Sequence, residues 1–324
     1  MKTFKAIGLI SGGLDSALAV KLLLEQNIQV IALHLVTPFS PHFGEKLTRR
    51  VTRMAAKLGI QLCLLETGKD YLQIVKNPSY GYGQNLNPCI DCHLFMVQEA
   101  KKLMIKEKAS FIFTGEVLGQ RPFSQSRQTL ALIDRASHLE GYILRPLSAL
   151  LLPPTRPEIA GWVDRNRLLA IQGKQRKVQF ALAEEKQVED FASPAGGCLL
   201  TVPGFCRRLS DLMEHKAEFT NADCLLLQVG RHFRLTRESK LILPRDEGER
   251  ERLKQLKQPG DTLVSVDEAP GFMGLLQGNP VGTVWDIVAS YCPVPLAEVT
   301  VRTQRQSVKV SRKPKALFLP WLIK

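Results

Sequence analysis

The residues of this 324-residue chain that could carry chemistry fall into two groups, a glycine-rich turn near the start and a set of cysteines. The turn, Ser11-Gly12-Gly13-Leu14-Asp15-Ser16, stands between an apolar run and a stretch with helical apolar spacing. Adjacent glycines weaken helices and strands, so they indicate a tight turn whose backbone N–H groups can approach an anion. The turn lacks the lysine of the Walker phosphate loop, and Asp15 beside phosphates requires a cation such as Mg2+.

Cys89 and Cys92 follow Asn87 and Pro88, residues typical of a helix N-cap and of the first helical position. Three residues apart in a first turn, the two thiols should point the same way, and the helix dipole should lower their pKa values. Two cysteines do not complete a metal site, so Cys198, which follows two glycines, is the candidate third sulfur. Seven cysteines and no export signal argue against a disulfide framework.

The elements that must position these groups alternate between strand-like and helix-like segments over the first half of the chain, which predicts an α/β fold with a doubly wound parallel sheet. In such sheets ligands bind beyond the carboxyl ends of the strands. The expected strands are 4–10, 29–35, 61–65 and 110–114, and the expected helices are 16–26, 46–58 and 88–108.

Past residue 195 short strand candidates dominate, which predicts a smaller α+β domain. Its expected strands are 224–230, 240–244, 261–266 and 299–304, and its expected helices are 247–256 and 281–291. The predicted division is a nucleotide domain at 1–192, a linker at 193–220 that carries Cys198, and a basic domain at 221–324.

The formal net charge of +13 favours a polyanionic partner such as nucleic acid. No apolar stretch reaches the roughly 18 to 20 residues of a membrane span, so we expect no membrane partner. The start lacks the pattern of a signal peptide, because Gly12, Gly13 and Asp15 interrupt the apolar run early, and a cytoplasmic location is expected.

The SGGLDS turn resembles the pyrophosphate loop of the N-type ATP pyrophosphatases, which adenylate a substrate with ATP. The resemblance implies ATP and Mg2+ at Ser11, Gly12, Gly13, Asp15 and Ser16. It also implies adenine beside the second strand, at Ala32 and His34, with His34 as a core histidine left open. The turn that closes the nucleotide site would be Gly115 and Glu116, with Arg121 neutralising phosphate, and an unliganded surface loop is the alternative.

A CIDC pair and a distant GGC cysteine beside such a loop resemble the tRNA thiouridine synthetases, some of which hold a [4Fe-4S] cluster on three cysteines. The resemblance implies Cys89, Cys92 and Cys198 as cluster ligands and Asp15, Cys89 and Cys198 as catalytic residues. Two other interpretations stay open. One is a cluster-free persulfide relay between Cys89 and Cys198, and the other is a structural zinc with a fourth ligand such as His93.

Residues 222–278 resemble the RNA-binding module of the NFACT family. With no N-terminal RNA-binding extension of the 4-thiouridine synthetase kind expected, RNA capture falls to the C-terminal domain, where Phe233 could stack on a base. The predicted RNA contacts are Lys174, Arg176, Lys177, Arg231, His232 and Arg234.

Together these features predict an ATP-dependent tRNA sulfurtransferase that forms AMP and pyrophosphate. Its partners would be tRNA and a sulfide or persulfide donor, and a homodimer is left open. Two other functions remain: an enzyme of the same superfamily that adenylates a small molecule, and a non-catalytic RNA-binding adaptor.

Overall fold

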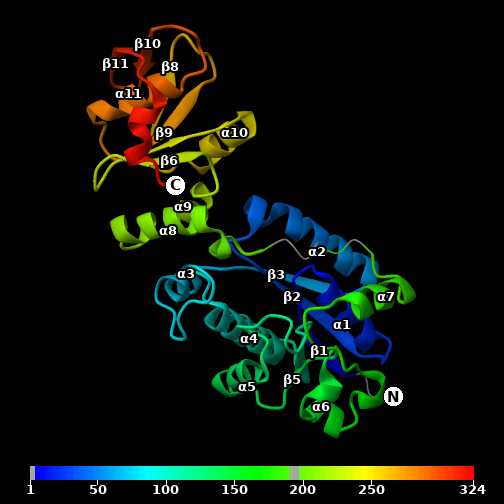
Figure 1. The fold of residues 1–324 in the computed structure, drawn as a ribbon. Coiled ribbons are helices and arrows are strands. Elements are labelled where there is room, and N and C mark those ends of the chain that lie inside the picture. The colour runs from blue at the N-terminus through cyan, green and yellow to red at the C-terminus, as the bar shows by residue number, and fades with distance from the viewer. Residues whose placement is uncertain (1–3, 190, 192–196) are drawn as a thin grey trace. The chain divides into compact units, whose positions relative to one another are not determined.

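The computed structural model describes residues 4–189, 191 and 197–324, and the chain divides into two compact units, Met1–Thr201 and Val202–Lys324 (Figure 1). Residues 193–196 of the predicted linker lie outside the described residues. The predicted linker at 193–220 is divided between the units, because Cys198 belongs to the first and helix α8 (Pro203–His215) to the second.

The first unit is built on a parallel sheet of five strands in the order β3-β2-β1-β4-β5. The four strands expected from the sequence are confirmed, and the short fifth one was not predicted. The strands are β1 (Lys5–Leu9), β2 (Gln29–Val36), β3 (Gln61–Glu66), β4 (Phe111–Thr114) and β5 (Ile143–Leu144).

Helices cover both faces of this sheet, as the doubly wound prediction requires (Figure 1). Along β1, Ala6 packs with the helices of one face and Ile7 with those of the other, because successive side chains of a strand point to opposite sides. The helices are α1 (Leu14–Leu24), α2 (Glu45–Leu58), α3 (Lys69–Lys76), α4 (Cys89–Lys106), α5 (Arg127–Ala136), α6 (Arg156–Ile159) and α7 (Lys177–Glu185), with 3-10 turns at Pro41–Gly44, Ala149–Leu151, Arg165–Arg167 and Leu199–Thr201.

The chain runs from β1 outward through β2 to β3, then returns to the other side of β1 to form β4 and β5. The order therefore reverses between β1 and β4, which is the place where ligands bind in doubly wound sheets. The glycine turn follows β1 and the Gly115 turn follows β4, so both predicted nucleotide-binding turns lie at this switch point.

The second unit contains an antiparallel sheet of six strands in the order β11-β10-β8-β9-β7-β6. Helix α11 buries Val284, Ile287 and Val288 in the core that this sheet helps to form. The strands are β6 (Arg231–Arg234), β7 (Lys240–Leu243), β8 (Thr262–Val266), β9 (Met273–Gln277), β10 (Glu298–Arg302) and β11 (Ser307–Ser311). The helices are α8, α9 (Asn221–Leu226), α10 (Glu247–Leu256) and α11 (Gly282–Tyr291), with a 3-10 turn at Lys315–Trp321.

The predicted strand at 224–230 is wrong, because Asn221–Leu226 is helical. Thr220 and Asp223 form a capping box in which each side chain accepts a hydrogen bond from the backbone N–H of the other residue. A short apolar run fits a strand or a buried helix equally well, and this cap decides for the helix.

Candidate active site

The glycine turn leads from β1 directly into helix α1. Gly12 adopts a left-handed conformation with φ +73°, and a Cβ there would lie 2.8 Å from Cγ2 of Val51. Gly13 is the N-cap of α1, and the Ser16 hydroxyl donates to its carbonyl over 2.8 Å. Because Gly13 has no side chain with which to cap the helix, the N–H groups of the first turn are left for an anion.

Asp15 is held by two side chains that come from distant parts of the first unit. Its Oδ2 accepts from Arg176 Nη2 at 2.7 Å and from Gln120 Nε2 at 3.0 Å. Three buried polar atoms of this cluster have no hydrogen-bond partner within the described residues: Asp15 Oδ1, Gln120 Oε1 and Arg176 Nε. Buried polar atoms are rarely left unpaired, so the cluster has the capacity to take a further polar ligand.

Gly115 brings the turn after β4 against the start of α1. A Cβ at this position would lie 2.5 Å from the backbone nitrogen of Ser16, so the two backbones touch and only glycine fits. The predicted juxtaposition of the two turns is therefore present in the structure.

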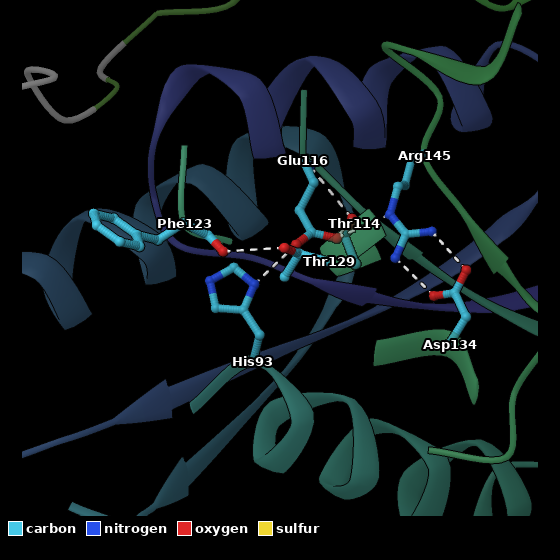
Figure 2. Close-up of polar contacts among 7 residues, drawn as sticks. All are labelled: His93, Thr114, Glu116, Phe123, Thr129, Asp134 and Arg145. Carbon is cyan, nitrogen blue, oxygen red and sulfur yellow. Dashed lines mark hydrogen bonds and ion pairs between the residues drawn. The ribbon is translucent and has the colours of Figure 1, made fainter. Parts of the chain in front are cut away.

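The side chain of Glu116 is engaged within the protein on both of its oxygens (Figure 2). Oε1 accepts from Nδ1 of His93 at 2.8 Å, and Oε2 accepts from the Thr114 hydroxyl and from Nε of Arg145, each at 3.0 Å. Burial alone would raise the pKa of this carboxyl, but the Arg145 guanidinium and the hydrogen bond from His93 outweigh it and lower the pKa to about 2. Glu116 thus anchors the turn after β4 to His93, Thr114 and Arg145. Its contact with the nucleotide stays a prediction.

Arg145 extends this buried network by a two-pronged contact with Asp134, whose carboxylate oxygens accept at 2.7 and 3.0 Å (Figure 2). The network joins His93 of α4 and Asp134 of α5 to Glu116 and Arg145, which follow the ends of β4 and β5. A buried charge chain of this kind positions the first turn of α4, which carries the CxxC pair, against the end of β4.

The CxxC pair opens helix α4, with Pro88 rather than Asn87 at the N-cap. Asp91, between the two cysteines, is buried and accepts from the N–H groups of Ser79 and Tyr80 at 2.9 and 3.1 Å. These bonds fix the preceding loop to the first turn of the helix.

Tyr71 contacts Cys92 and lies within electrostatic range of the other two predicted sulfur ligands, Cys89 and Cys198. Its buried hydroxyl lies 3.2 Å from Sγ of Cys92, and burial together with the nearby thiols of Cys92, Cys198 and Cys89 raises its pKa well above the ordinary value. The segment after Cys198 is attached to this region, because the N–H of Leu86 donates to the carbonyl of Leu200 at 3.2 Å.

The prediction of lowered thiol pKa values is wrong for this state of the protein. Burial raises the pKa of Cys89 and raises that of Cys92 to about 11, against the lowering effect of Arg121 on both. Desolvation in the first turn outweighs the helix dipole. The charge of Arg121, predicted to lie over phosphate, reaches the two cysteines.

The structure supports the core interpretation of His34. The residue is buried, and its Nδ1–H donates to the carbonyl of Ile10 at 2.8 Å, while burial lowers its pKa. Ala32 is fully buried in β2, so its side chain offers no open surface to adenine.

Several predicted RNA contacts are corrected by the structure. His232 and Phe233 are fully buried, with Nε2 of His232 donating to the carbonyl of Val229, and Arg234 makes a two-pronged ion pair with Asp211. Arg176 pairs with Asp15, as described above. Arg231 is half-buried and stacks over the ring of Tyr291, whereas Lys174 and Lys177 are exposed.

Tyr71, Gln120, Asp134 and Arg145 were absent from the predicted site residues. No local pattern distinguishes them, because each acts through a partner from another element. A basic face of α2 was also missed, although the run of cations between residues 46 and 53 could have indicated it. This face consists of Lys46, Thr48, Arg49, Arg50, Thr52 and Arg53.

Family models match both parts of the chain. Residues 2–151 match the model described as thiamine biosynthesis protein (ThiI), and residues 230–316 match that of the NFACT protein RNA binding domain.

Among relatives, a probable tRNA sulfurtransferase of Thermococcus kodakarensis is 26% identical over 155 residues, which cover 45% of this chain and 37% of that protein. A tRNA-specific 2-thiouridylase MnmA of Dehalococcoides mccartyi is 34% identical over 95 residues, 27% of each chain. A solved 4-thiouridine synthetase–RNA complex with bound ATP aligns at 20% identity and a TM-score of 0.36, covering 58% of this chain and 52% of that chain. The chain thus spans little more than a third of the length of the Thermococcus relative. By these matches, residues 2–151 are similar to the ThiI family, and residues 230–316, the NFACT-type domain, are similar to the NFACT RNA-binding domains.

Proposed function

We propose that the protein is an ATP-dependent tRNA sulfurtransferase that replaces a uridine carbonyl oxygen with sulfur. The observation that carries this proposal is that the glycine turn with Asp15 and the predicted sulfur ligands belong to the same unit and are connected by one segment. A turn with the features of an anion site holds Asp15, and the residues that follow Gly115 connect that turn to the thiols in the region of Tyr71. Both family matches and the names of the relatives agree with this function.

In the first step the uridine carbonyl oxygen attacks the α-phosphate of ATP, the bond to the β-phosphate breaks, and pyrophosphate leaves. The N–H groups of the first turn of α1 and the Ser11 hydroxyl would bind the departing pyrophosphate. Asp15 would hold Mg2+, for which its unpaired buried Oδ1 is a suitable ligand. Adenylation makes the oxygen a good leaving group, so a sulfur nucleophile can then attack the carbon and expel AMP.

For the sulfur step we propose that Cys89, Cys92 and Cys198 hold a [4Fe-4S] cluster. Three thiols within electrostatic range of one buried tyrosine are a chemically suitable donor set, although no three His, Cys, Asp or Glu side chains of the described residues are already arranged to hold a metal ion. When bound, a cluster on three cysteines supplies an iron with an open position that can carry hydrosulfide. The chain's contribution is to present the half-buried thiols of Cys89, Cys92 and Cys198 in the region of Tyr71.

A cluster-free relay is the second candidate, and the same absence of a ready metal triad within the described residues favours it. In this relay Cys89 would carry the transferable sulfur as a persulfide. Cys198 would attack the Cys89 sulfur once the outer sulfur has bonded to the base, so that a Cys89–Cys198 disulfide forms and the thiouridine is released. A reductant would then restore both thiols. The cluster route needs an external sulfide donor, and the relay needs an external persulfide donor that transfers its outer sulfur to Cys89.

The tRNA would be bound through its phosphates. The basic face of α2 and the exposed Lys174 and Lys177 offer cations in the first unit, and the NFACT-type domain is the other candidate surface.

The predicted cytoplasmic location agrees with a tRNA substrate. No helix among the described residues is long and apolar enough to cross a membrane.

Two measurements test the proposal. The first is release of pyrophosphate and AMP from ATP on addition of tRNA, which a small-molecule adenylating enzyme or an RNA adaptor would not show. The second is iron and sulfide analysis after anaerobic purification, where the cluster predicts about four irons per chain. Cys198→Ala should lose the iron, while the matched control Cys63→Ala, on strand β3, should retain it. A colourless, iron-free protein that still thiolates tRNA would establish the relay.

A further inference from the structure

The segment after β4 connects the glycine turn to the sulfur site, which is defined here as the thiols of Cys89, Cys92 and Cys198. Its residues act on the two sites in chain order. Gly115 touches the backbone of Ser16, and Gln120 donates to Asp15. The next residue, Arg121, acts electrostatically on Cys89 and Cys92. A group held against this segment would therefore lie between the phosphate-binding turn and the thiols.

Phe123 stands at the end of this segment and is 60% exposed. The backbone around it is fixed by several hydrogen bonds. The Phe123 carbonyl accepts from the Thr129 hydroxyl at 3.2 Å, the N–H of Gln125 donates to the carbonyl of Arg121 at 2.9 Å, and Ser124 is buried. The ring projects away from the buried network of His93 and Glu116 (Figure 2).

The neighbour of the ring is the loop that precedes the CxxC pair. A Cβ at Gly83 would lie 3.5 Å from Cγ of Phe123, so the ring packs against the Gly83 backbone. Tyr80 and Tyr82 of the same loop are also exposed, and Asp91 fixes this loop to the first turn of α4. An exposed aromatic surface with an arginine beside it thus adjoins the sulfur site.

We propose that Phe123 is the platform on which the target uridine stacks after it leaves its RNA helix, with Arg121 binding an adjacent phosphate. The inference rests on the proposed function and adds the position of the reacting base. The base must present its oxygen to the α-phosphate and its carbon to the sulfur, and Phe123 ends the segment that joins those two sites. Aromatic rings stack on any base, and enzymes that modify a base take it out of the helix. The positive charge of Arg121 favours RNA over an apolar protein partner.

The test compares Phe123→Ala with Phe123→Trp, and uses Ile159→Ala as the matched control because Ile159 is an exposed apolar residue elsewhere in the same unit. The first readout is the kcat/KM for pyrophosphate release with unmodified tRNA transcripts, and the second is the Kd for ATP without RNA. For Phe123→Ala we expect kcat/KM to fall about 5- to 150-fold, the range that base–aromatic stacking gives. The Kd for ATP should be unchanged, and Phe123→Trp should retain activity.

The possible failures are distinguishable. If the wild-type protein releases no pyrophosphate on addition of tRNA, the proposed function fails and the platform fails with it. If the wild type is active and Phe123→Ala has the same kcat/KM, the stacking role of Phe123 is refuted while the proposed function stands. The same result is expected if Phe123 bound another protein instead of the base. A loss of ATP affinity in Phe123→Ala, or loss of activity in Phe123→Trp, would assign the ring a structural role and overturn the inference.

Discussion

Replacing Arg176 by glutamine removes the cation that faces Asp15 in the nucleotide turn. The Asp15 and Arg176 side chains are 16% and 15% exposed and meet at 2.7 Å. In the variant, Gln120 still donates to Asp15, but the partly buried carboxylate loses its opposite charge.

Breaking a fully buried ion pair by removing one partner costs about 3–5 kcal/mol. Residual exposure and the remaining bond from Gln120 reduce this, so we expect about 2 kcal/mol of destabilisation. For a unit of this size, that corresponds to a fall in Tm of about 4–8 °C.

The assay is thermal unfolding with and without Mg2+, in the absence of nucleotide. Because Arg176 and a divalent cation compete for Asp15, Mg2+ alone should stabilise Arg176→Gln more than it stabilises the wild type. The charge-matched control Arg135→Gln, at an exposed position of α5, should change neither the Tm nor the response to Mg2+. An unchanged Tm in Arg176→Gln, or an identical response of both proteins to Mg2+, would show that Arg176 neither stabilises Asp15 nor competes with the cation for it.

Three further predictions concern the supports of the two units. Gly115→Ala should abolish ATP binding while the circular dichroism of the fold is kept, since its Cβ would meet the Ser16 nitrogen at 2.5 Å; unchanged ATP affinity would contradict the contact. In the folded protein the pKa of Glu116 is lowered from 4.5 to about 2. The ionised carboxylate therefore contributes on the order of 3 kcal/mol to the free energy of unfolding above pH 4.5, and this contribution is lost as the pH falls towards 2. Urea unfolding between these pH values should therefore be less pH-dependent in Glu116→Gln. Asp211→Asn should destabilise the second unit by about 3 kcal/mol, because Lys240, 4% exposed, loses its carboxylate partner; an unchanged urea midpoint would show that the pair contributes little.

The predictable part of the fold is the part that local sequence encodes. The strands of the parallel sheet are continuous apolar runs, and the glycine turn lies between such a run and a helical pattern, so both could be identified without the structure. The same holds for the approach of Gly115 to the nucleotide turn, because the carboxyl ends of neighbouring parallel strands meet at one edge of the sheet.

The parts that failed depend on long-range partners. Arg176 looks like one member of a basic cluster, and its pairing with Asp15 follows only from the packing of the segment before α7. His232 occurs among arginines in the sequence, yet it is fully buried in β6 together with its neighbour Phe233. The thiols of α4 are in a first helical turn, as expected, but their burial raises the pKa values that the dipole alone would lower. Sequence patterns report residue type and period, and neither of these encodes desolvation.

The most direct test of the central claim is mass spectrometry of the nucleosides from tRNA transcripts that were incubated with the protein, ATP, Mg2+ and a sulfide donor. We expect a thiouridine that forms only when ATP is present, and that is lost in Asp15→Asn and in Cys198→Ala but retained in Cys63→Ala. Thiouridine formation that persists without ATP or in Asp15→Asn, or its absence with the wild-type protein, would contradict it.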